Sequence, residues 1–274
     1  MDHPQVTGAG ANVSPLLKTM IDAAHSAGDG LREDFVHIAS LEIERKIGPD
    51  PVSAADLRAE STLQSALSAA YPDYGFLGEE GGLVAGTDDT HVWIVDPLDG
   101  TANFLCGLPL FAVNVALARG GKVIAGVTHI PMMGETFWAE AGGGAWLNGK
   151  PISVSGQSDL LRSILAVGIP FAGKPRHGQF LAEMERLTPK VLGLHRLGAA
   201  AVDMAYVACG RFDAYWEQSL NAWDMAAGVV IVGEAGGIVT DTVGRLLDLH
   251  GGTVLAATPQ LHQELLAELA PVDG

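Results

Sequence analysis

The stretch Trp93-Ile-Val-Asp-Pro-Leu-Asp-Gly-Thr-Ala-Asn-Phe104 decides the interpretation of this sequence, because an apolar strand runs directly into two aspartates. Asp96 follows the strand that we predict at 92–95, so its side chain starts near the protein interior. An unpaired buried carboxylate costs several kcal/mol or becomes protonated. No Lys or Arg lies between Thr62 and Arg119, so no basic partner is close in sequence. The aspartates therefore need another source of positive charge.

A divalent metal ion would supply that charge. Pro97 stiffens the turn and can hold the carboxylates of Asp96 and Asp99 and the carbonyl of Leu98 facing one point. Hard oxygen ligands with no nearby His or Cys cluster favour Mg²⁺ over Zn²⁺. The next pair, Gly100-Thr101, offers backbone N–H groups, which form an anion site if a helical turn begins there. The combination predicts a phosphate held by metal ions and amides, whereas a Gly-Thr pair alone is typical of an ordinary turn.

Further acidic residues lie at the predicted ends of helices or strands: Glu79, Glu80, Glu217, Asp224 and Asp56. Taken singly, each has an ordinary explanation. The glutamates could be solvated charges in a loop or at a strand end, and Asp224 could be a helix N-cap. Asp56 could be the acid of a capping box, Ser53-Ala-Ala-Asp56. Their position at element boundaries nevertheless makes them candidates for the same site as Asp96.

Apolar periodicity predicts both helices and strands. We expect helices at 14–47, 53–71 and 177–187, and from about residues 199, 224 and 259 onward. We expect strands at 76–77, 92–95, 111–118, 122–130, 135–139, 145–147, 164–167, 213–216, 238–240 and 254–257. Asn148-Gly149 is typical of a hairpin turn, which indicates antiparallel pairing. This mixture predicts layered helices and mixed sheets in one domain at 14–270, after a flexible N-terminus at 1–13.

Composition indicates a soluble cytoplasmic protein. The 274 residues include 16 basic and 32 acidic side chains, which gives a net charge of −16. An acidic chain repels nucleic acid and anionic membranes, so neither is an expected partner. Residues 1–13 do not resemble a signal peptide, and no run of about 18 apolar residues occurs. The two cysteines, Cys106 and Cys209, are expected to be free thiols in a reducing compartment.

Several segments resemble signatures of the inositol monophosphatase family. Asp96-Pro-Leu-Asp-Gly-Thr-Ala-Asn-Phe104, with Pro109 downstream, is similar to the first signature, and Trp223-Asp-Met-Ala-Ala-Gly228 is similar to the second. Other segments resemble the metal-binding, water-positioning and substrate-contacting parts of the family: Gly78-Glu79-Glu80, Val52-Ser-Ala-Ala-Asp56, and Leu197-Gly-Ala-Ala-Ala201 with Glu217. The segments follow the order of the family, and the similarity covers residues from about 14 to 270.

The resemblance implies an α+β fold, a layered αβαβα sandwich like that of inositol monophosphatase and fructose-1,6-bisphosphatase, usually assembled as a homodimer. It implies hydrolysis of phosphate monoesters with two to three Mg²⁺ ions, for which Mn²⁺ can substitute, and often inhibition by Li⁺. Glu79, Asp96 and the Leu98 carbonyl would hold the first ion. Asp96, Asp99 and Asp224 would hold the second, and a weaker third ion would lie near Glu79.

The same resemblance implies roles toward water and substrate. Thr101, Asp56 and Glu79 would orient the attacking water, so that no covalent intermediate forms. The amides of Gly100 and Thr101 would bind the phosphate. The remaining substrate contacts implied by the resemblance are Asp99, Gly198, Ala199, Ala200, Glu217 and Asp224.

Departures from the family pattern concern the substrate pocket. Ala199 stands where many members have Thr, and Val167-Gly-Ile-Pro170 lacks the Thr of a similar bacterial segment. Inositol 1-phosphate is the expected substrate, with histidinol phosphate, 3′,5′-bisphosphate nucleotides and fructose 1,6-bisphosphate as alternatives. A bisphosphate would need extra cations, for which the candidates are Arg45, Lys46, Lys174, Arg176 and Arg196. A non-catalytic regulator with the same fold is the alternative from another class.

Overall fold

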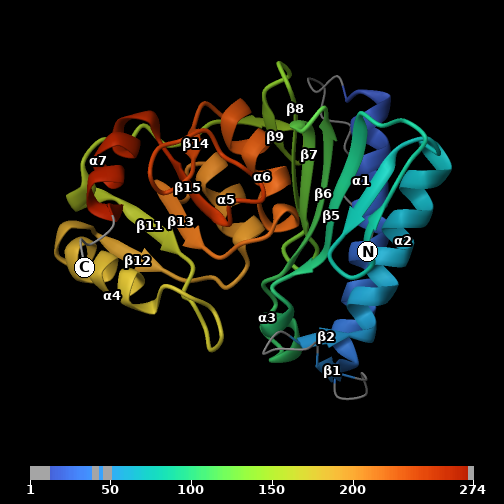
Figure 1. The fold of residues 1–274 in the computed structure, drawn as a ribbon, viewed down its shortest axis with the longest axis horizontal. Coiled ribbons are helices and arrows are strands. Elements are labelled where there is room, and N and C mark those ends of the chain that lie inside the picture. Colours follow the sequence, from blue (N-terminus) through green and yellow to red (C-terminus); the bar gives the residue numbers. More distant parts are fainter. Residues whose placement is uncertain (1–12, 39–42, 46–50, 271–274) are drawn as a thin grey trace.

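Five alternating layers of helices and sheets make up the fold (Figure 1). The computed structural model describes residues 13–38, 43–45 and 51–270. The αβαβα sandwich predicted from the sequence is confirmed. The segment predicted to be flexible, at 1–13, lies outside the described residues except for Val13.

The first two layers contain two helices and a large sheet. The helices are α1 (Pro15–Val36) and α2 (Ala54–Ala70), which cover one face of eight strands. In spatial order these are β10 (Lys150–Ile152), β9 (Ala145–Leu147), β8 (Glu135–Glu140), β7 (Lys122–Ile130), β6 (Ala112–Arg119), β5 (His91–Asp99), β3 (Gly75–Gly78) and β4 (Gly82–Val84). The neighbours are antiparallel except for β3 and β5. A separate antiparallel pair consists of β1 (Ile43–Arg45) and β2 (Pro51–Ser53).

The other three layers complete the sandwich. The middle helices, α5 (Ala200–Ala208) and α6 (Ala222–Glu234), lie between the large sheet and a five-stranded sheet (Figure 1). That sheet has the order β12 (Gly193–His195), β11 (Ile164–Val167), β13 (Ala214–Gln218), β15 (Thr253–Ala257) and β14 (Ile238–Thr240). The outer helices are α4 (His177–Leu187) and α7 (Pro259–Leu269). Three short helices are α3 (Thr101–Leu105), η2 (Leu160–Arg162) and η3 (Thr188–Lys190).

Residue size explains how closely the layers pack. Alternate residues of β6 face opposite sides of the sheet. Val113, Val115 and Leu117 pack toward α1 and α2, whereas Ala112 and Ala116 belong to the cluster that includes α5 and α6. Small side chains on the second face allow the middle helices to approach the backbone of the sheet. Asp224, in the first turn of α6, is thereby brought close to the end of β5.

The first predicted helix is too long. Ser14 caps α1 by accepting a hydrogen bond from the Leu17 N–H at 3.1 Å, as its position suggests. The helix ends at Val36, however, and residues 43–45 form β1 rather than the helix expected up to residue 47. These residues pair with β2, and apolar spacing alone does not reveal a strand partner located downstream in the sequence.

The strand predicted at 92–95 is too short. β5 continues through Asp99, because Asp96 pairs with Asn114 and Asp99 pairs with Ala112. Asp96 and Asp99 are three residues apart in β5, whereas their partners in β6 are two residues apart. The extra residue in β5 forms a β-bulge, and Pro97 lies inside it. Residues three apart in a regular strand face opposite sides. The extra residue allows both aspartates to face the same side of the sheet.

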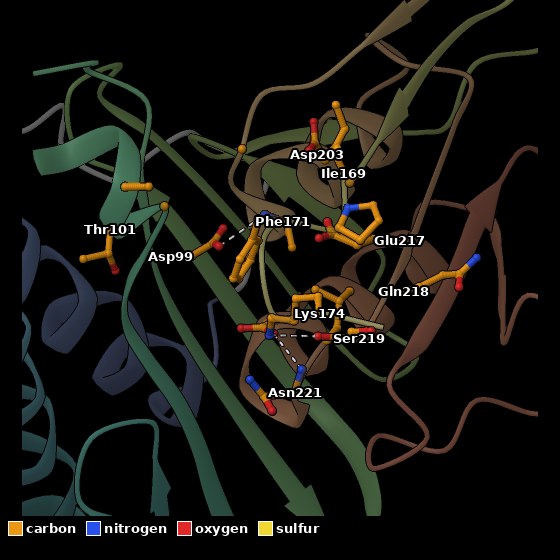
Figure 2. A pocket seen from close by; sticks show the side chains of 18 of the residues that line it. Asp99, Thr101, Ile169, Phe171, Lys174, Asp203, Glu217, Gln218, Ser219 and Asn221 are labelled. Carbon is orange, nitrogen blue, oxygen red and sulfur yellow. Dashed lines mark hydrogen bonds between the residues drawn. The ribbon is translucent and has the colours of Figure 1, made fainter. Parts of the chain in front are cut away.

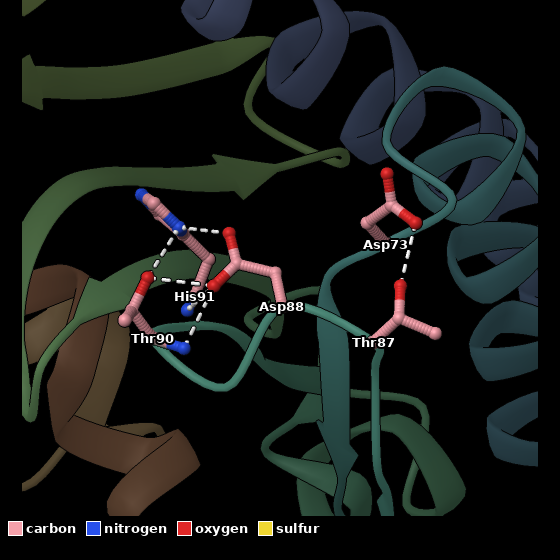
Figure 3. A network of polar contacts seen from close by, with 5 residues as sticks. All are labelled: Asp73, Thr87, Asp88, Thr90 and His91. Atoms are coloured by element: carbon pink, nitrogen blue, oxygen red, sulfur yellow. Dashed lines mark hydrogen bonds and ion pairs between the residues drawn. The ribbon is translucent and has the colours of Figure 1, made fainter.

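The loop before β5 is held by a network of polar contacts (Figure 3). The carboxylate of Asp88 accepts hydrogen bonds from the Thr90 N–H at 2.7 Å and the Thr90 hydroxyl at 2.6 Å, and contacts His91 Nδ1 at 2.6 Å. The Thr87 hydroxyl donates to Asp73. The hydrogen bonds from Thr90 hold the pKa of Asp88 well below its usual value. Asp88 therefore stays ionised and fixes the start of β5.

Two simpler expectations concern the cysteines and the membrane. Cys106 is exposed and Cys209 is half-buried, and both are free thiols, as predicted. Across residues 13–38, 43–45 and 51–270, every helix is too short or too polar to cross a membrane.

The contact between α6 and the large sheet can be tested at Gly126 in β7. A β-carbon there would lie 2.7 Å from the carbonyl oxygen of Ala227. We expect Gly126→Val to lower the free energy of unfolding by about 1–3 kcal/mol, the usual cost of overpacking. Gly30→Ala is the matched control, since a β-carbon at Gly30 in α1 meets nothing within 4 Å. The control should be neutral or stabilise by about 0.5–1 kcal/mol. Denaturant unfolding measures the free energy of unfolding of both variants. Equal changes in the two variants would contradict the close contact between β7 and α6.

Candidate active site

The residues predicted from the sequence meet around one cavity of about 190 Å³ (Figure 2). It lies where the end of β5 and the start of α3 face the start of α5, the end of β13 and the start of α6. The predicted residues that line it are Glu79, Leu98, Asp99, Gly100, Thr101, Gly198, Ala200, Glu217 and Asp224. Three others, Asp56, Asp96 and Ala199, are buried and do not form its wall.

Asp96 is one of the most deeply buried of these acids. Its side chain is 1% exposed, and its Oδ1 accepts a hydrogen bond from the Leu98 N–H at 3.0 Å. Burial raises the pKa of Asp96 well above its usual value, and the negative charges of Glu79, Asp99 and Asp224 raise it further. The chain therefore holds this carboxyl group in an environment that opposes its ionisation.

Asp99 joins β5 to the first turn of α5. Its carboxylate accepts hydrogen bonds from the N–H groups of Ala200 at 3.2 Å and Ala201 at 2.8 Å. Burial and then the charge of Asp224 nevertheless raise the pKa of Asp99 well above its usual value. Ala200 is an expected substrate contact, but its N–H already donates to Asp99 in this structure.

Asp224 lies in the first turn of α6, but it is not the N-cap. Asn221 occupies that position, and its backbone N–H donates to Asp224 Oδ2 at 2.6 Å. Burial raises the pKa of Asp224 to about 7, although the hydrogen bond from the Asn221 N–H lowers it. A cation beside this carboxyl group would favour its ionised form.

Thr101 begins α3 and contacts two candidate site residues. Its Oγ1 lies 3.0 Å from the Leu98 carbonyl oxygen and 3.2 Å from Asp56 Oδ1, which comes from the first turn of α2. Gly100 precedes it with φ of +91°, a conformation that favours glycine. A β-carbon at Gly100 would also lie 3.1 Å from the side chain of Ala199. Ala199 therefore packs behind this turn and does not face the cavity.

The donor chemistry fits a hard divalent cation. Carboxylates and the Leu98 carbonyl are the ligands that Mg²⁺ prefers. None of the ion pairs found among the described residues involves Asp96, Asp99 or Asp224. In the described ranges, however, no three acidic, histidine or cysteine side chains already converge on one point closely enough to hold an ion. Ion binding would require the side chains to draw together.

Glu60 is a site residue that sequence reasoning missed. Its carboxylate accepts hydrogen bonds from the N–H groups of Glu80 at 2.8 Å and Gly81 at 2.6 Å. A β-carbon at Gly78 would lie 2.4 Å from Glu60 Oε2, so the glycine makes room for this contact. Glu60 therefore positions the turn that carries Glu79. It lies one helical turn after Asp56 on the buried side of α2, which is the signal that could have identified it.

Glu217 is held on the opposite side of the cavity. The Tyr215 hydroxyl donates to it, and burial raises the pKa of its carboxyl group. A β-carbon at Gly168 would lie 1.8 Å from the carboxyl carbon of Glu217. The backbone of Gly168 thus fits against Glu217, and the residues that follow it, Ile169 and Phe171, form part of the cavity wall.

The basic residues that could bind a second phosphate lie in different parts of the structure. Lys174 and Arg196 line the cavity, whereas Arg176 lines another pocket. Lys174 Nζ donates to the Ser219 carbonyl at 3.4 Å (Figure 2). Arg45 belongs to β1, and Lys46 lies outside the described residues.

The two sides of the cavity are tied together by Asn103 in α3. Its Nδ2 donates to the carbonyl oxygens of Leu110 and Leu197, each at 2.8 Å. Leu197 precedes the turn that leads into α5. This link and the contacts of Asp99 fix the first signature against α5.

Residues 12–272 match the inositol monophosphatase family. The chain belongs to this family. It is 49% identical over 253 residues to the inositol-1-monophosphatase of Caulobacter vibrioides, which covers 91% of this chain and 99% of that protein. It is also 38% identical to Nus factor SuhB of Pseudomonas aeruginosa, with 94% of this chain and 97% of that protein covered.

A solved structure has the same architecture. The extragenic suppressor protein SuhB of Bartonella henselae superposes with a TM-score of 0.91 at 42% identity, covering 93% of this chain and 98% of that chain. Together with the relatives named inositol-1-monophosphatase, the family match supports a phosphatase.

The raised pKa of Asp224 predicts a pH-dependent stability. The folded, metal-free chain binds this proton more tightly than the unfolded chain does, so the resulting stability is fully present below the usual pKa of 3.8 and is lost as the pH rises through about 7. We expect the Tm of metal-free protein to fall between about pH 5 and about pH 8. Mg²⁺ should raise Tm more at the higher pH.

Thermal unfolding of the wild type and of Asp224→Asn at several pH values measures this effect. The variant cannot ionise at this position, so its Tm should fall less steeply over the same range. Identical slopes for the two proteins would show that Asp224 does not carry the effect.

Glu60 should control divalent-ion binding through the turn that it holds. Glu60→Gln keeps the shape but replaces one acceptor oxygen by a donor amide, so the turn loses a hydrogen bond. We expect Mg²⁺ affinity, measured by calorimetry, to fall by about 10-fold or more, as is usual when a supporting contact of a ligand is removed. Ser61→Ala, an exposed neighbour on α2, is the control and should bind normally. Unchanged affinity in Glu60→Gln would rule out this positioning role.

Proposed function

We propose that this chain is a Mg²⁺-dependent phosphate monoester hydrolase that converts inositol monophosphate and water to inositol and phosphate. The observation that carries the proposal is that Asp96, Asp99 and Asp224 are buried near one another beside a helical turn whose amides are suited to phosphate. Burial, followed by nearby negative charges, raises the pKa values of all three, which supports a site that takes up a cation. The similarity to proteins named inositol-1-monophosphatase supports the choice of ester.

The ions would be held by carboxylates and one backbone carbonyl of the cavity. Glu79, Asp96 and the Leu98 carbonyl would hold one ion, and Asp96, Asp99 and Asp224 would hold a second, with Mn²⁺ able to substitute. When bound, Mg²⁺ supplies Lewis-acid polarisation of the phosphate and lowers the pKa of a water molecule.

Thr101 and its neighbours would orient the attacking water. The Thr101 hydroxyl has one proton, which it donates to Asp56 or to the Leu98 carbonyl, since both lie within hydrogen-bond distance. Its oxygen is then left to accept a hydrogen bond from water. Glu79, on the same cavity wall, offers a further acceptor. Two acceptors on different elements would fix the direction of the water's lone pair.

The phosphate would rest against the start of α3. The first N–H groups of a helix have no intrahelical acceptor, so those of Gly100 and Thr101 are suited to phosphate oxygens. Lys174 and Arg196 are the cations at the cavity wall, but Lys174 already contacts the Ser219 carbonyl, and Glu217 faces the same space. A carboxylate at this position disfavours a second phosphate, which supports a monoester over the bisphosphate alternatives.

A regulatory role beside catalysis is the second candidate, because one relative is named Nus factor SuhB. The predicted ligands Glu79, Asp96, Asp99 and Asp224 are all present, which supports retained catalysis in this chain. Phosphate release with Mg²⁺ separates the two roles, since a purely regulatory protein would release none.

Asp96→Asn should abolish Mg²⁺-dependent phosphate release from inositol 1-phosphate while the fold remains intact. The amide removes a negative charge that the ions require but leaves the size of the buried side chain unchanged. Circular dichroism checks the fold, and Asp22→Asn on the exposed face of α1 is the control that should keep full activity. Ordinary turnover in Asp96→Asn would remove Asp96 from the metal site.

Thr101→Ala should lower kcat by roughly 10²-fold, on the scale of losing a positioned hydrogen-bonding group. Thr101→Ser keeps the hydroxyl and should retain most of the activity. Steady-state kinetics with inositol 1-phosphate measures both variants, with histidinol phosphate and fructose 1,6-bisphosphate as competing substrates. An alanine variant with the kcat of the wild type would show that Thr101 is only a turn residue.

A further inference from the structure

Asp203 lies on the wall of the active-site cavity and has no role in the proposal above. It is the only charged residue in α5, where its neighbours are mostly alanine and valine. The side chain is 1% exposed, and its Oδ1 has no hydrogen-bond partner within the described ranges. Figure 2 shows Asp203 on the same side of the cavity as Glu217.

An unpartnered buried carboxyl oxygen is costly, so a ligand that satisfies it gains affinity from the contact. The charges that act on Asp203 are those of Glu217 and Asp99, which repel it, and Arg196, which attracts it. Arg196 is exposed and forms no ion pair with Asp203 in the described residues. The partner of Asp203 therefore has to come from the cavity.

A neutral hydroxyl group fits this position. Lys174, Arg196 and the carboxyl groups of the cavity wall already place charges of both signs around Asp203. A hydroxyl donates a hydrogen bond without adding charge. Glu217, which is held by Tyr215, offers a second carboxyl acceptor on the same side.

The rest of the cavity suits the carbon face of a ring. Ile169 and Phe171 line it and are 39% and 40% exposed, so they present apolar surface to a ligand. Two carboxyl acceptors together with an apolar wall match a cyclic compound that carries several hydroxyl groups. A simple aromatic or alkyl alcohol could use the wall but not the acceptors.

We propose that Asp203 is a specificity-determining residue that accepts a hydrogen bond from a hydroxyl group of a polyhydroxylated leaving alcohol, beside the position of Glu217. The inference rests on the proposed function and deepens it. It assigns the selection of a polyol over other alcohols to α5, and leaves the hydrolytic step to the residues of β5, α3 and α6.

The test compares two esters that share the phosphate but differ in the alcohol. Inositol 1-phosphate can donate to Asp203, and p-nitrophenyl phosphate cannot. In Asp203→Ala, kcat/KM for inositol 1-phosphate should fall by about 10- to 100-fold, the scale of leaving a buried hydrogen-bonding group without its partner, with little change for p-nitrophenyl phosphate. Asp203→Asn keeps one acceptor oxygen and the size of the side chain, so its loss should be smaller. The asparagine variant also provides the test if the alanine variant fails to fold.

Met204→Ala is the matched control, because Met204 is the next residue of α5, is buried, and does not line the cavity. A change in the packing of α5 should lower kcat/KM for both esters by the same factor. An equal loss of kcat/KM for both esters in the Asp203 variants, or no loss for inositol 1-phosphate, would overturn the role of Asp203. Absence of any Mg²⁺-dependent hydrolysis by the wild type would instead overturn the proposed function, so the two failures are distinguishable.

Discussion

Buried negative charge at the end of β5 is the constraint on which the site depends. The bulge at Pro97 turns Asp96 and Asp99 toward one side of the large sheet, and α6 brings Asp224 to the same place. Burial raises the pKa values of all three, and nearby negative charges raise them further. Such an arrangement costs stability in the absence of a counter-ion. The three apolar clusters that join the five layers offset this cost and keep the acids in place.

In the proposed function, the two sides of the cavity have different tasks. Asp96, Asp99, Thr101, Asp56 and Asp224, from β5, α3, α2 and α6, together with Glu79, which follows β3, would act at the phosphate end. Glu217 from β13 and Asp203 from α5 would face the alcohol end. Asp99 and Asn103 connect the halves through hydrogen bonds to α5 and to the turn before it. This division explains how one hydrolytic centre could serve different alcohols when residues of the second half change.

Several residues act by holding others rather than by touching a ligand. Glu60 holds the turn that carries Glu79, and Gly78 leaves space for it. Gly168 does the same for Glu217, since any side chain there would overlap the carboxyl group. Close packing of this kind leaves little freedom in the positions of the acids. The site is therefore built as much from small residues as from charged ones.

The sequence by itself determined the fold class, most of the strands and the acids of the candidate site. Apolar periodicity is a local property, and the signature around Asp96 is contiguous, so both can be read without a structure. The tertiary structure alone decided that α1 ends at Val36, that β5 continues through a bulge to Asp99, and that Asn221 rather than Asp224 caps α6. It also decided that Glu60 and Asp203 belong to the site. The reason is physical: strand pairing, burial and hydrogen bonds between distant segments depend on which residues meet in space, and spacing along the chain does not encode those partners.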